Sequence, residues 1–478
     1  MNRKFFWMMI AFIVVIAGWV VPPPAGLPVD GMRMVGLFLG VLLLWLTVGI
    51  DWSSFLAIGL LSLIPSVGIK GAYGASFGSP ITVFLITTFL CTFVLSETPF
   101  VKRCAISFMT SHWAKKGPWW FILSYVAAIL FIGSFMSPTV TFLLFLPIME
   151  DILRMLGIEK GHSLGKMMMV LLASCSSISS GMTPIAHVFN IMAMSLYQAA
   201  TGNIIGYGPY MVFAIPVGIL TSLALVVLFR VGMKPDMDIF QKVDYGALEA
   251  QIPPMDKREK LCLSIFGVVV ALWVVPSLLV GIMPGVMKPF LALSIAFPPI
   301  VGILLYSLVH VDGKPLLDIP SAMQKGVPWP AVLMAAASMG LIGALTQKEI
   351  GITPYMVSVI QPMLEGVAPY ALLVGIALWT IYQVNLSSNI VTIVIVCSVS
   401  LPVLLNMGGA LSVPAVISVV GLLGSFAFAT PPSMIHIAIS ISTGWVDTRT
   451  TFVYGMVLAG ISAVFAVLIG YPIAAALM

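Results

Sequence analysis

Charged side chains are rare in this sequence. Only 8% of the 478 residues are Asp, Glu, Lys or Arg, while 60% are hydrophobic and the mean hydropathy is +1.11. Soluble domains carry roughly 25% charged residues. This composition excludes an ordinary soluble enzyme or binding protein, and it predicts a membrane protein.

Cysteines and nucleotide motifs are also scarce. The five cysteines lie in or near apolar runs without C-x-x-C spacing, so neither a disulfide framework nor a zinc site is expected. No G-x-x-x-x-G-K-[ST] loop indicates an ATP-driven pump. A channel stays an open alternative, although no segment resembles a ring-forming selectivity sequence. The basic residues stand in small groups beside apolar runs rather than along one face, which argues against a nucleic acid partner.

Long apolar runs are what the sequence has instead. The runs "FFWMMIAFIVVIAGWVV", "MVGLFLGVLLLWLTVGI", "MVFAIPVGILTSLALVVLF" and "LCLSIFGVVVALWVVPSLLV" each approach the ~20 residues that cross a bilayer core about 30 Å thick. The first run has no A-x-A cleavage pattern, so we expect a retained helix rather than a signal peptide. The sequence therefore predicts an all-α polytopic membrane protein.

The chain divides into two halves that echo each other. Its one long polar stretch, 230–260, is interpreted as a cytoplasmic linker between an N-terminal half, 1–229, and a second repeat, 261–478. "SPTVT" at 137–141 matches "SNIVT" at 388–392 in Ser, Val and Thr, an offset of 251 residues. Further echoes recur in the same order at nearly that offset, which indicates an internal repeat.

Each half contains an apolar segment that proline interrupts. A segment too long for one crossing breaks at Ser137-Pro138, because proline disfavours helix at its own position and at the one before. We predict two re-entrant hairpins, with tips near 137 and 388. Segments interrupted at Thr183-Pro184 and at Thr430-Pro431 predict two discontinuous helices, broken near 183 and 430.

The positive-inside rule gives an orientation for about eleven spans and two hairpins. With the N-terminus in the cytoplasm and the C-terminus outside, only Arg33, Lys70, Lys288 and Lys348 of the 22 basic residues fall outside. An odd number of crossings between the repeats makes them inverted. Inverted repeats with broken helices are typical of secondary transporters whose sites lie near the midplane. The expected location is the plasma (inner) membrane.

Polar residues at a hairpin tip have a physical use. A break at membrane depth leaves backbone groups to be satisfied by protein, water or ligand. Half-helix N-termini favour an anion, while carbonyl and hydroxyl oxygens can replace the hydration shell of a cation. The alternative is that Ser, Thr and Asn simply hydrogen-bond across helices, although their recurrence beside a second break in each half favours a site.

The predicted spans leave every Asp and Glu at a span end or in a loop, so no carboxylate lies at mid-membrane. Proton-driven carriers usually titrate an intramembrane acid or histidine. The candidates for a proton relay in this chain are therefore His187 and His436. The alternative for each is a neutral imidazole bonded to a loosened backbone carbonyl.

The motifs "SSNIVT" with "FATPPS", and "MSPTVT" with "GMTPIAHVFN", resemble those of the divalent anion:sodium symporter (INDY-type) family of dicarboxylate, tricarboxylate or sulfate carriers. The resemblance covers essentially the whole chain and guided the placement of the hairpins. It implies a homodimer, an elevator-type movement and sodium ions as coupling ions, with no other cofactor.

The resemblance also implies site residues. Around the substrate it places Ser137, Pro138, Thr139, Thr183, Pro184, Ser388, Asn389, Ile390, Thr430 and Pro431. Around sodium it places Ser137, Gly181, Ser387, Asn389 and Ala429. Pro138 stands where the family has asparagine, and Ile390 where it has a second threonine. These two departures weaken the first cation site and suggest a substrate that is smaller, more apolar or less charged than a standard dicarboxylate.

We therefore expect a secondary active transporter of small anions rather than an enzyme, with sodium symport as the first choice. The alternative is a cation-independent anion exchanger. A distant alternative is an intramembrane serine hydrolase, because "GASFG" at 74–78 fits G-x-S-x-G. That motif is expected in a loop before a span, and such a hydrolase would need Ser76 to meet a histidine.

Overall fold

The computed structural model describes residues 3–478 apart from 251, 253, 281, 292, 294–295, 346, 353, 356–357 and 360–366. The helices of the first half are α1 (Arg3–Val20), α2 (Val29–Thr47), α3 (Asp51–Leu61), α4 (Gly68–Ser76), α5 (Pro80–Ser96), α6 (Phe100–Met109), η1 (Ala114–Lys116), α7 (Pro118–Gly133), α8 (Pro138–Met155), α9 (Ser163–Met182), α10 (Val188–Thr201), α11 (Tyr207–Leu228) and η2 (Phe229–Met233).

The linker and the second half contain the remaining elements. In the linker lie η3 (Asp238–Lys242) and α12 (Tyr245–Glu249), and they are followed by α13 (Lys257–Leu279), α14 (Pro284–Leu291), α15 (Phe297–Leu308), α16 (Ile319–Lys325), α17 (Trp329–Leu345), α19 (Pro369–Leu386), α20 (Asn389–Leu405), α21 (Val413–Ser425), α22 (Ile435–Ser442), α23 (Thr448–Phe465), η4 (Ala466–Gly470) and α24 (Tyr471–Leu477). A small antiparallel hairpin pairs β1 (His310–Val311) with β2 (Lys314–Pro315), His310 lying opposite Pro315.

Many of these helices begin for a local reason. Proline occupies the first position of α5, α7, α8 and α19, where its fixed φ suits a helix and its missing N–H costs nothing. Aspartate caps the N-terminus of α13, where the Asp256 carboxylate accepts a hydrogen bond of 2.6 Å from the N–H of Glu259. Gly202 ends α10 with φ of 76°, a conformation that glycine adopts readily.

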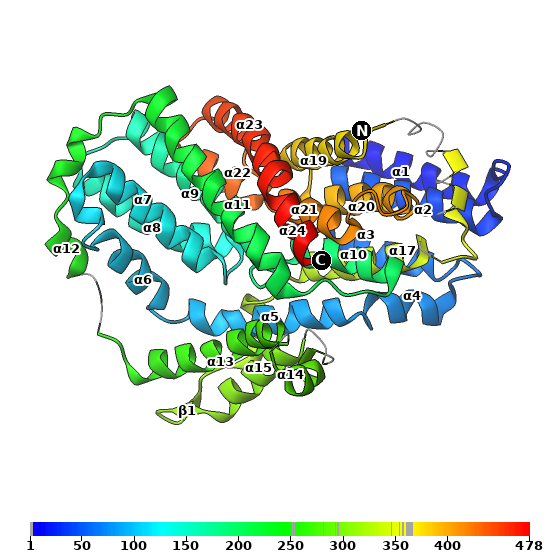
Figure 1. Ribbon diagram of the computed structural model, residues 1–478, viewed down its shortest axis with the longest axis horizontal. Coiled ribbons are helices and arrows are strands. Elements are labelled where there is room, and N and C mark those ends of the chain that lie inside the picture. Colours follow the sequence, from blue (N-terminus) through cyan, green and yellow to red (C-terminus); the bar gives the residue numbers. More distant parts are fainter. Residues whose placement is uncertain are drawn as a thin grey trace.

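Three central helices, α9, α10 and α21, are covered on every side. Every residue from Met167 to Met182, from Val188 to Tyr197 and from Ala415 to Ser425 is buried. A helix that is buried all round must be apolar all round or have its polar groups paired. In Figure 1, α9 runs between α7 and α8 on one side and α22 to α24 on the other. These helices form the core around which the hairpins are arranged.

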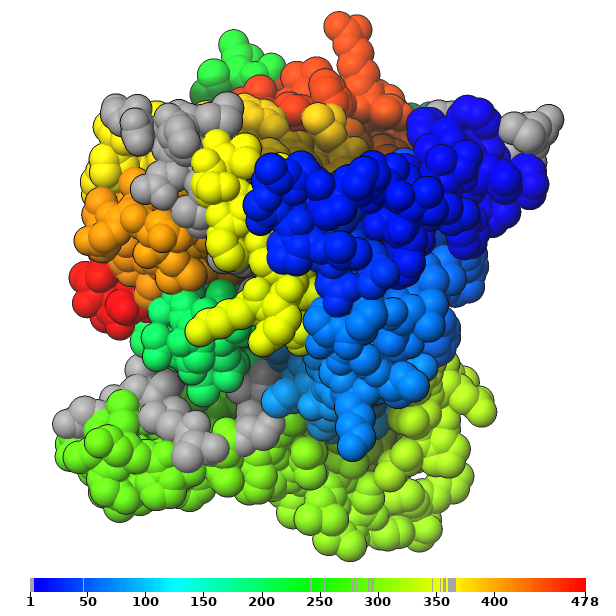
Figure 2. Space-filling view, turned by 90° about the vertical axis from the view of Figure 1, so that its right-hand side faces the viewer, coloured from blue at the N-terminus to red at the C-terminus, as the bar shows by residue number. Residues whose placement is uncertain are grey.

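The helices from α13 to α16 form a separate outer layer. Of these, α13, α14 and α15 run along the lower edge of Figure 1, below α5, and Figure 2 shows this part of the chain as a band beneath α1 and α2. One buried ion pair joins this layer to the first half. The guanidinium of Arg103 on α6 donates hydrogen bonds of 2.9 and 2.8 Å to the carboxylate of Glu259, which is fully buried.

The predicted linker is partly helical. Its α12 packs against the segment after α6, where the Tyr245 hydroxyl donates to the carbonyl of Ala114 at 3.4 Å and Lys115 pairs with Glu249 at 3.0 Å, while η3 packs against α7. Residues 257–260, assigned to the linker in the sequence, form the first turn of α13. Because Asp256 caps the helix, α13 begins at Lys257, several residues before its apolar run.

Length and apolarity identify five of the described helices as able to cross a membrane, or six if the pair α16 and α17, bent by 77°, is one span. Together with the helical architecture this confirms the predicted all-α polytopic membrane fold. The count of eleven crossings stays a prediction, because other apolar helices, such as Lys4–Val20 of α1 and Val413–Ser425 of α21, are shorter than a full span.

Candidate functional site

The first predicted hairpin tip lies between two helices. α7 ends at Gly133 and α8 begins at Pro138, with Ser137 extended as its N-cap at φ of −57° and ψ of 140°. A Cβ added to Gly133 would collide with the side chain of Ser179 on α9, so only glycine allows the hairpin to lie this close to the broken helix. The tip is therefore tightly held against α9.

The first break separates α9 from α10 at Thr183, Pro184 and the next three residues. The side chain of Asn190 on α10 spans this gap. Its amide nitrogen lies 3.0 Å from the carbonyl oxygen of Ser180, 3.2 Å from that of Gly181 and 3.0 Å from that of Thr183. The hydroxyl of Tyr210 donates a further hydrogen bond of 2.9 Å to the Gly181 carbonyl.

The second hairpin and the second break are joined by a different asparagine. The amide nitrogen of Asn385, at the end of α19, donates to the carbonyls of Ile381 at 2.8 Å and Phe426 at 2.9 Å. Its side-chain oxygen accepts from the backbone N–H groups of Phe428 at 2.7 Å and Ala429 at 3.0 Å. The fully buried side-chain amide of Asn385 thus forms hydrogen bonds with four backbone groups of the hairpin and the unwound segment.

The two halves share one contact that follows the repeat. In the first, the hydroxyl of Thr183 donates to the carbonyl of Ser134, and in the second that of Thr430 donates to the carbonyl of Asn385 at 2.6 Å. Ser134 and Asn385 are separated by 251 residues, the offset found between the matching motifs in the sequence. In both halves, the threonine of the Thr-Pro motif thus hydrogen-bonds to the C-terminal end of the helix that leads into the hairpin tip, which is α7 in the first half and α19 in the second.

The elements that follow each break cross into the other half. α10 packs against α20 and α21, whereas α22 packs against α8 and α9. Each hairpin therefore lies beside the second part of the opposite broken helix. The predicted site residues come from these elements, so the two tips and the two breaks lie around one central region.

The exposure of the predicted residues varies. Ser137, Thr139, Ser387, Ser388 and Thr430 are half-buried, Pro431 is exposed, and Pro138, Gly181, Thr183, Pro184, Asn389, Ile390 and Ala429 are buried. Among the described residues, no hydrogen bond reaches the hydroxyls of Ser137, Thr139 or Ser388, or the side-chain oxygen of Asn389, whose nitrogen donates to the Gly424 carbonyl at 2.8 Å. Both tips thus present oxygens that are still able to bind a ligand.

The predicted cation ligands differ between the halves. The carbonyl of Gly181 already accepts from Asn190 and Tyr210, whereas that of Ala429 accepts no hydrogen bond from any described residue. The Ser387 hydroxyl lies 3.0 Å from the carbonyl of Gln383 and 3.3 Å from the hydroxyl of Thr392. The second break is therefore the more open of the two.

His436 is fully buried whereas His187 is half-buried, and His436 joins the halves. Its Nε2 lies 3.1 Å from the carbonyl of Ala173 and 3.0 Å from the hydroxyl of Ser177, which itself donates to the carbonyl of Ala427 at 2.6 Å. Because Ser177 and Ala173 both offer oxygens here, Nε2 carries the proton. The imidazole thus bonds to a backbone carbonyl, as in the alternative to a proton relay, but that carbonyl belongs to a residue within α9 and not to a loosened break. His187 stacks beside Phe189, with 4.0 Å between the ring centroids.

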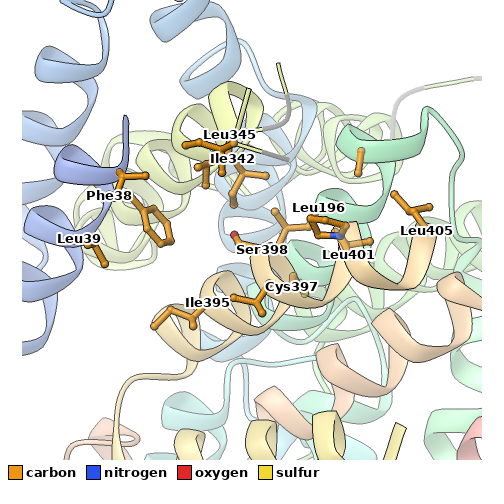
Figure 3. A pocket seen from close by; sticks show the side chains of 15 residues that line it. Phe38, Leu39, Leu196, Ile342, Leu345, Ile395, Cys397, Ser398, Leu401 and Leu405 are labelled. Carbon is orange, nitrogen blue, oxygen red and sulfur yellow. The ribbon is translucent and has the colours of Figure 1, made fainter. Parts of the chain in front are cut away.

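Two apolar cavities lie beside the hairpins. One of about 290 Å³ separates α2 and α17 from α10 and α20, and Figure 3 shows Phe38, Ile342 and Leu401 facing it from three of these helices. The other, about 600 Å³, lies among α7, α11 and α13 and is lined by Ser134 and Thr183. Their linings are too apolar to bind a small anion, so these are gaps between packed units.

Several polar residues at the centre were missed in the sequence. Asn190, Asn385 and Ser177 were assigned no role, although each makes contacts that hold a break in place. The signal was present in "SCSSISS", residues 174–180, a serine-rich run in which every residue is buried. Such a run inside an apolar helix indicates a polar junction rather than lipid contact.

The serine motif at 74–78 has no catalytic surroundings in the described part of the chain. Ser76 is the last residue of α4 rather than part of a loop, and its fully buried hydroxyl has no hydrogen-bond partner. No described histidine bonds to it, so this geometry gives the hydrolase alternative no support.

A loop clasp joins the two repeats at one end of the central helices. We define it by three contacts: Trp445 Nε1 to Glu150 at 2.9 Å, Lys160 Nζ to the Thr443 carbonyl at 2.6 Å, and Lys166 Nζ to Asp447 at 2.7 Å. Each connects α8, α9 or the loop between them to the loop between α22 and α23. The clasp fixes the two broken helices relative to each other.

The ion pair of the clasp predicts a pH dependence. The Lys166 ammonium, and then the Thr450 N–H, hold the pKa of Asp447 well below its usual value of 3.8. The pair therefore contributes its full stabilisation above the usual pKa of 3.8, which applies to the unfolded chain, and loses it as the pH falls from there toward the lower pKa of the folded state. Asp447→Asn should lower the free energy of unfolding by about 0.2–1 kcal/mol at pH 7, because the pair is exposed. In melting curves from pH 7 to pH 3, the difference from the unsubstituted protein should shrink with acidification. A difference that grows would contradict this assignment.

Comparison with known proteins gives three findings. The sequence pattern of the family described as "Citrate transporter" (CitMHS) matches residues 40–421. A "Membrane protein" of Cupriavidus necator is 20% identical over 365 residues, which cover 71% of this chain and 66% of that protein's length. The structure of MtrF from Neisseria gonorrhoeae, described as illuminating a class of antimetabolite efflux pumps, superposes with a TM-score of 0.61 at 13% identity over 98% of this chain and 93% of MtrF. This last likeness shows a shared fold.

Proposed function

The chain belongs to the citrate transporter family, and from this premise we propose that it carries a small carboxylate anion across the membrane by sodium-coupled symport. The family and the fold make it a multi-pass membrane transporter. Citrate or another di- or tricarboxylate is the proposed class of substrate, because the family match supports it over the smaller or less charged anion that Pro138 and Ile390 suggest. The observation that carries this proposal is the pair of half-helix N-termini at Ser137 and Ser388, each with hydroxyls that no described residue uses.

The tips suit an anion for an electrostatic reason. The N-terminus of a helix carries a partial positive charge and presents backbone N–H groups without helical partners. At the second tip, the first N–H groups of α20 and the Ser388 hydroxyl can donate to a carboxylate. At the first tip, Pro138 removes one N–H, so Thr139 and Ser137 supply most of the donors. Thr183, Pro184, Ile390, Thr430 and Pro431 would complete the walls of the site.

The proposed sodium ion belongs at the second break. Ser387, Asn389 and the carbonyl of Ala429 offer oxygens, which hard cations prefer as ligands. The carbonyl of Ala429 is outside any helix and accepts no hydrogen bond from a described residue. A cation there would lie beside the anion and partly neutralise its charge during the crossing.

The movement we propose is of the elevator type within a homodimer. The hairpins and broken helices are bound together by Asn385, Asn190 and the loop clasp, which favours their movement as one unit. The two apolar cavities lie where α20 and α7 face α2, α17 and α13. An apolar and loosely packed boundary has few hydrogen bonds to break, which favours sliding of one unit along the other.

Uptake into proteoliposomes tests this proposal. We expect radiolabelled citrate, succinate or tartrate to accumulate only when an inward sodium gradient is imposed. Sulfate and a monocarboxylate are the comparison anions. Accumulation of none of these anions under any gradient would contradict the proposed substrate class.

Anion exchange is the second candidate, and Pro138 favours it, since the first tip lacks the amide that Asn389 supplies to the second. In an exchanger, uptake would ignore sodium and would require unlabelled anion inside the vesicle. The same assay therefore separates the two mechanisms.

A further inference from the structure

The first break has its carbonyls satisfied by a single amide group. Asn190 is fully buried, and its side-chain nitrogen lies within 3.0 to 3.2 Å of three backbone carbonyl oxygens, those of Ser180, Gly181 and Thr183. Its side-chain oxygen accepts a hydrogen bond of 2.6 Å from Ser425 on α21, which fixes which end of the amide faces the break. The nitrogen thus stands at the point where the carbonyls of the unwound segment converge.

This arrangement is that of a cation site with a neutral donor at its centre. Carbonyl oxygens released by a helix break are the ligands that transporters use for small cations. An asparagine NH₂ group has two hydrogens and a partial positive charge, so it can satisfy such oxygens without an ion. With Tyr210 donating to the Gly181 carbonyl as well, little capacity remains there for a cation.

The second break lacks an equivalent. The Thr-Pro motifs at 183 and 430 differ by 247 residues, and the same offset takes Asn190 to Ile437, which has no donor. Asn385 reaches this break from the hairpin and bonds to the carbonyl of Phe426. The carbonyls of Phe428 and Ala429 accept no hydrogen bond from a described residue. The inverted repeats have therefore diverged in the groups that decide cation binding.

We propose that the amide of Asn190 is a built-in substitute for a coupling cation, so that the first repeat binds none and the carrier has at most one cation site, at the second break. This proposal rests on the proposed function for the meaning of that remaining site. The occupation of the first break by Asn190 is a property of the folded protein, and it can be tested without transport.

Sodium-dependent melting of the purified full-length protein in detergent is the test, with choline chloride as the control salt. A ligand that binds only the folded state raises Tm, by a few degrees at about 100 times its Kd. Asn389→Ala should remove the whole sodium-dependent rise, because the first break adds nothing. A saturable rise that survives in Asn389→Ala with an unchanged sodium Kd would show a cation bound away from the second break and would overturn the proposal.

Two substitutions at the first break provide the converse test. Asn190→Asp places a carboxylate among three carbonyls, and this cluster is stable only with a proton or a cation. We expect a lower Tm in choline chloride and a sodium-dependent rise that persists in the double variant with Asn389→Ala. Asn190→Ala, which vacates the position, should also acquire a weaker sodium-dependent rise. Absence of any gain in both folded variants would refute the idea that Asn190 stands in a cation position.

The outcomes distinguish this inference from the proposed function. If the unsubstituted protein shows no sodium-dependent rise and transports without sodium, the symport proposal fails, whereas a gain in Asn190→Asp still supports the substitute role of the amide. If the unsubstituted protein requires sodium and Asn389→Ala retains sodium binding, symport stands and the inference about Asn190 fails.

Discussion

Replacement of Asn389 by alanine is expected to abolish anion uptake while the protein still folds and inserts. Asn389 is the first residue of α20, at the tip of the second hairpin, where the proposed anion and cation meet. Each hydrogen bond to a charged ligand contributes about 1.5–3 kcal/mol, so the loss of two such bonds should reduce uptake roughly 100-fold or more.

A matched control lies at the other end of the same helix. The Asn406 side chain also donates a hydrogen bond of 2.8 Å to a backbone carbonyl, that of Pro402, but it is far from the tip. Asn406→Ala should therefore transport normally. Initial uptake rates in proteoliposomes, normalised to reconstituted protein, provide the comparison. Normal uptake by Asn389→Ala would remove the substrate site from this hairpin.

The second large effect is on stability. Asn385→Ala should lower the free energy of unfolding by about 3–5 kcal/mol, because it leaves the Phe426 carbonyl and two backbone N–H groups buried without partners, and each such group costs about 1–3 kcal/mol. This is near the upper end of what single substitutions do. Thermal or denaturant unfolding in detergent would measure it.

The control for this substitution is Asn203→Ala. Asn203 is exposed in the turn after α10, so its truncation should change the free energy of unfolding by less than about 0.5 kcal/mol. If Asn385→Ala proved as mild as this control, the second break would not depend on that amide.

The fold class and the positions of the breaks could be predicted because their signals are local. Apolar runs of a given length indicate spans, and proline at 138, 184 and 431 marks where a helix cannot continue. α8 begins at Pro138 and α20 at Asn389, beside the tips expected from sequence. The all-α membrane fold is confirmed, and the resemblance to anion symporters agrees with the family found by comparison. The roles of the site residues stay predictions.

The organisation of the breaks could not be predicted, because it depends on contacts between distant residues. Asn190 bonds to a turn seven to ten residues before it and to Ser425, 235 positions away. Nothing in the sequence around Asn190 says that its amide turns toward α9 rather than toward a neighbouring helix. Likewise, Ser177 and His436 meet only because α22 crosses to the first half. Side-chain direction on a buried helix is decided by packing.

The crossing of α10 and α22 into opposite halves also bears on how the protein is made. Contacts between residues far apart in sequence form late and slow folding, since long loops must close first. While the first half leaves the ribosome, Ser177 and Asn190 have no Ala427 or Ser425 to bond with, as these follow some 235 to 250 residues later. The emerging half must stay in the bilayer with its polar centre incompletely paired, a state that is prone to misassembly. Synthesis of the two halves as separate chains should therefore give functional protein only when both are produced together.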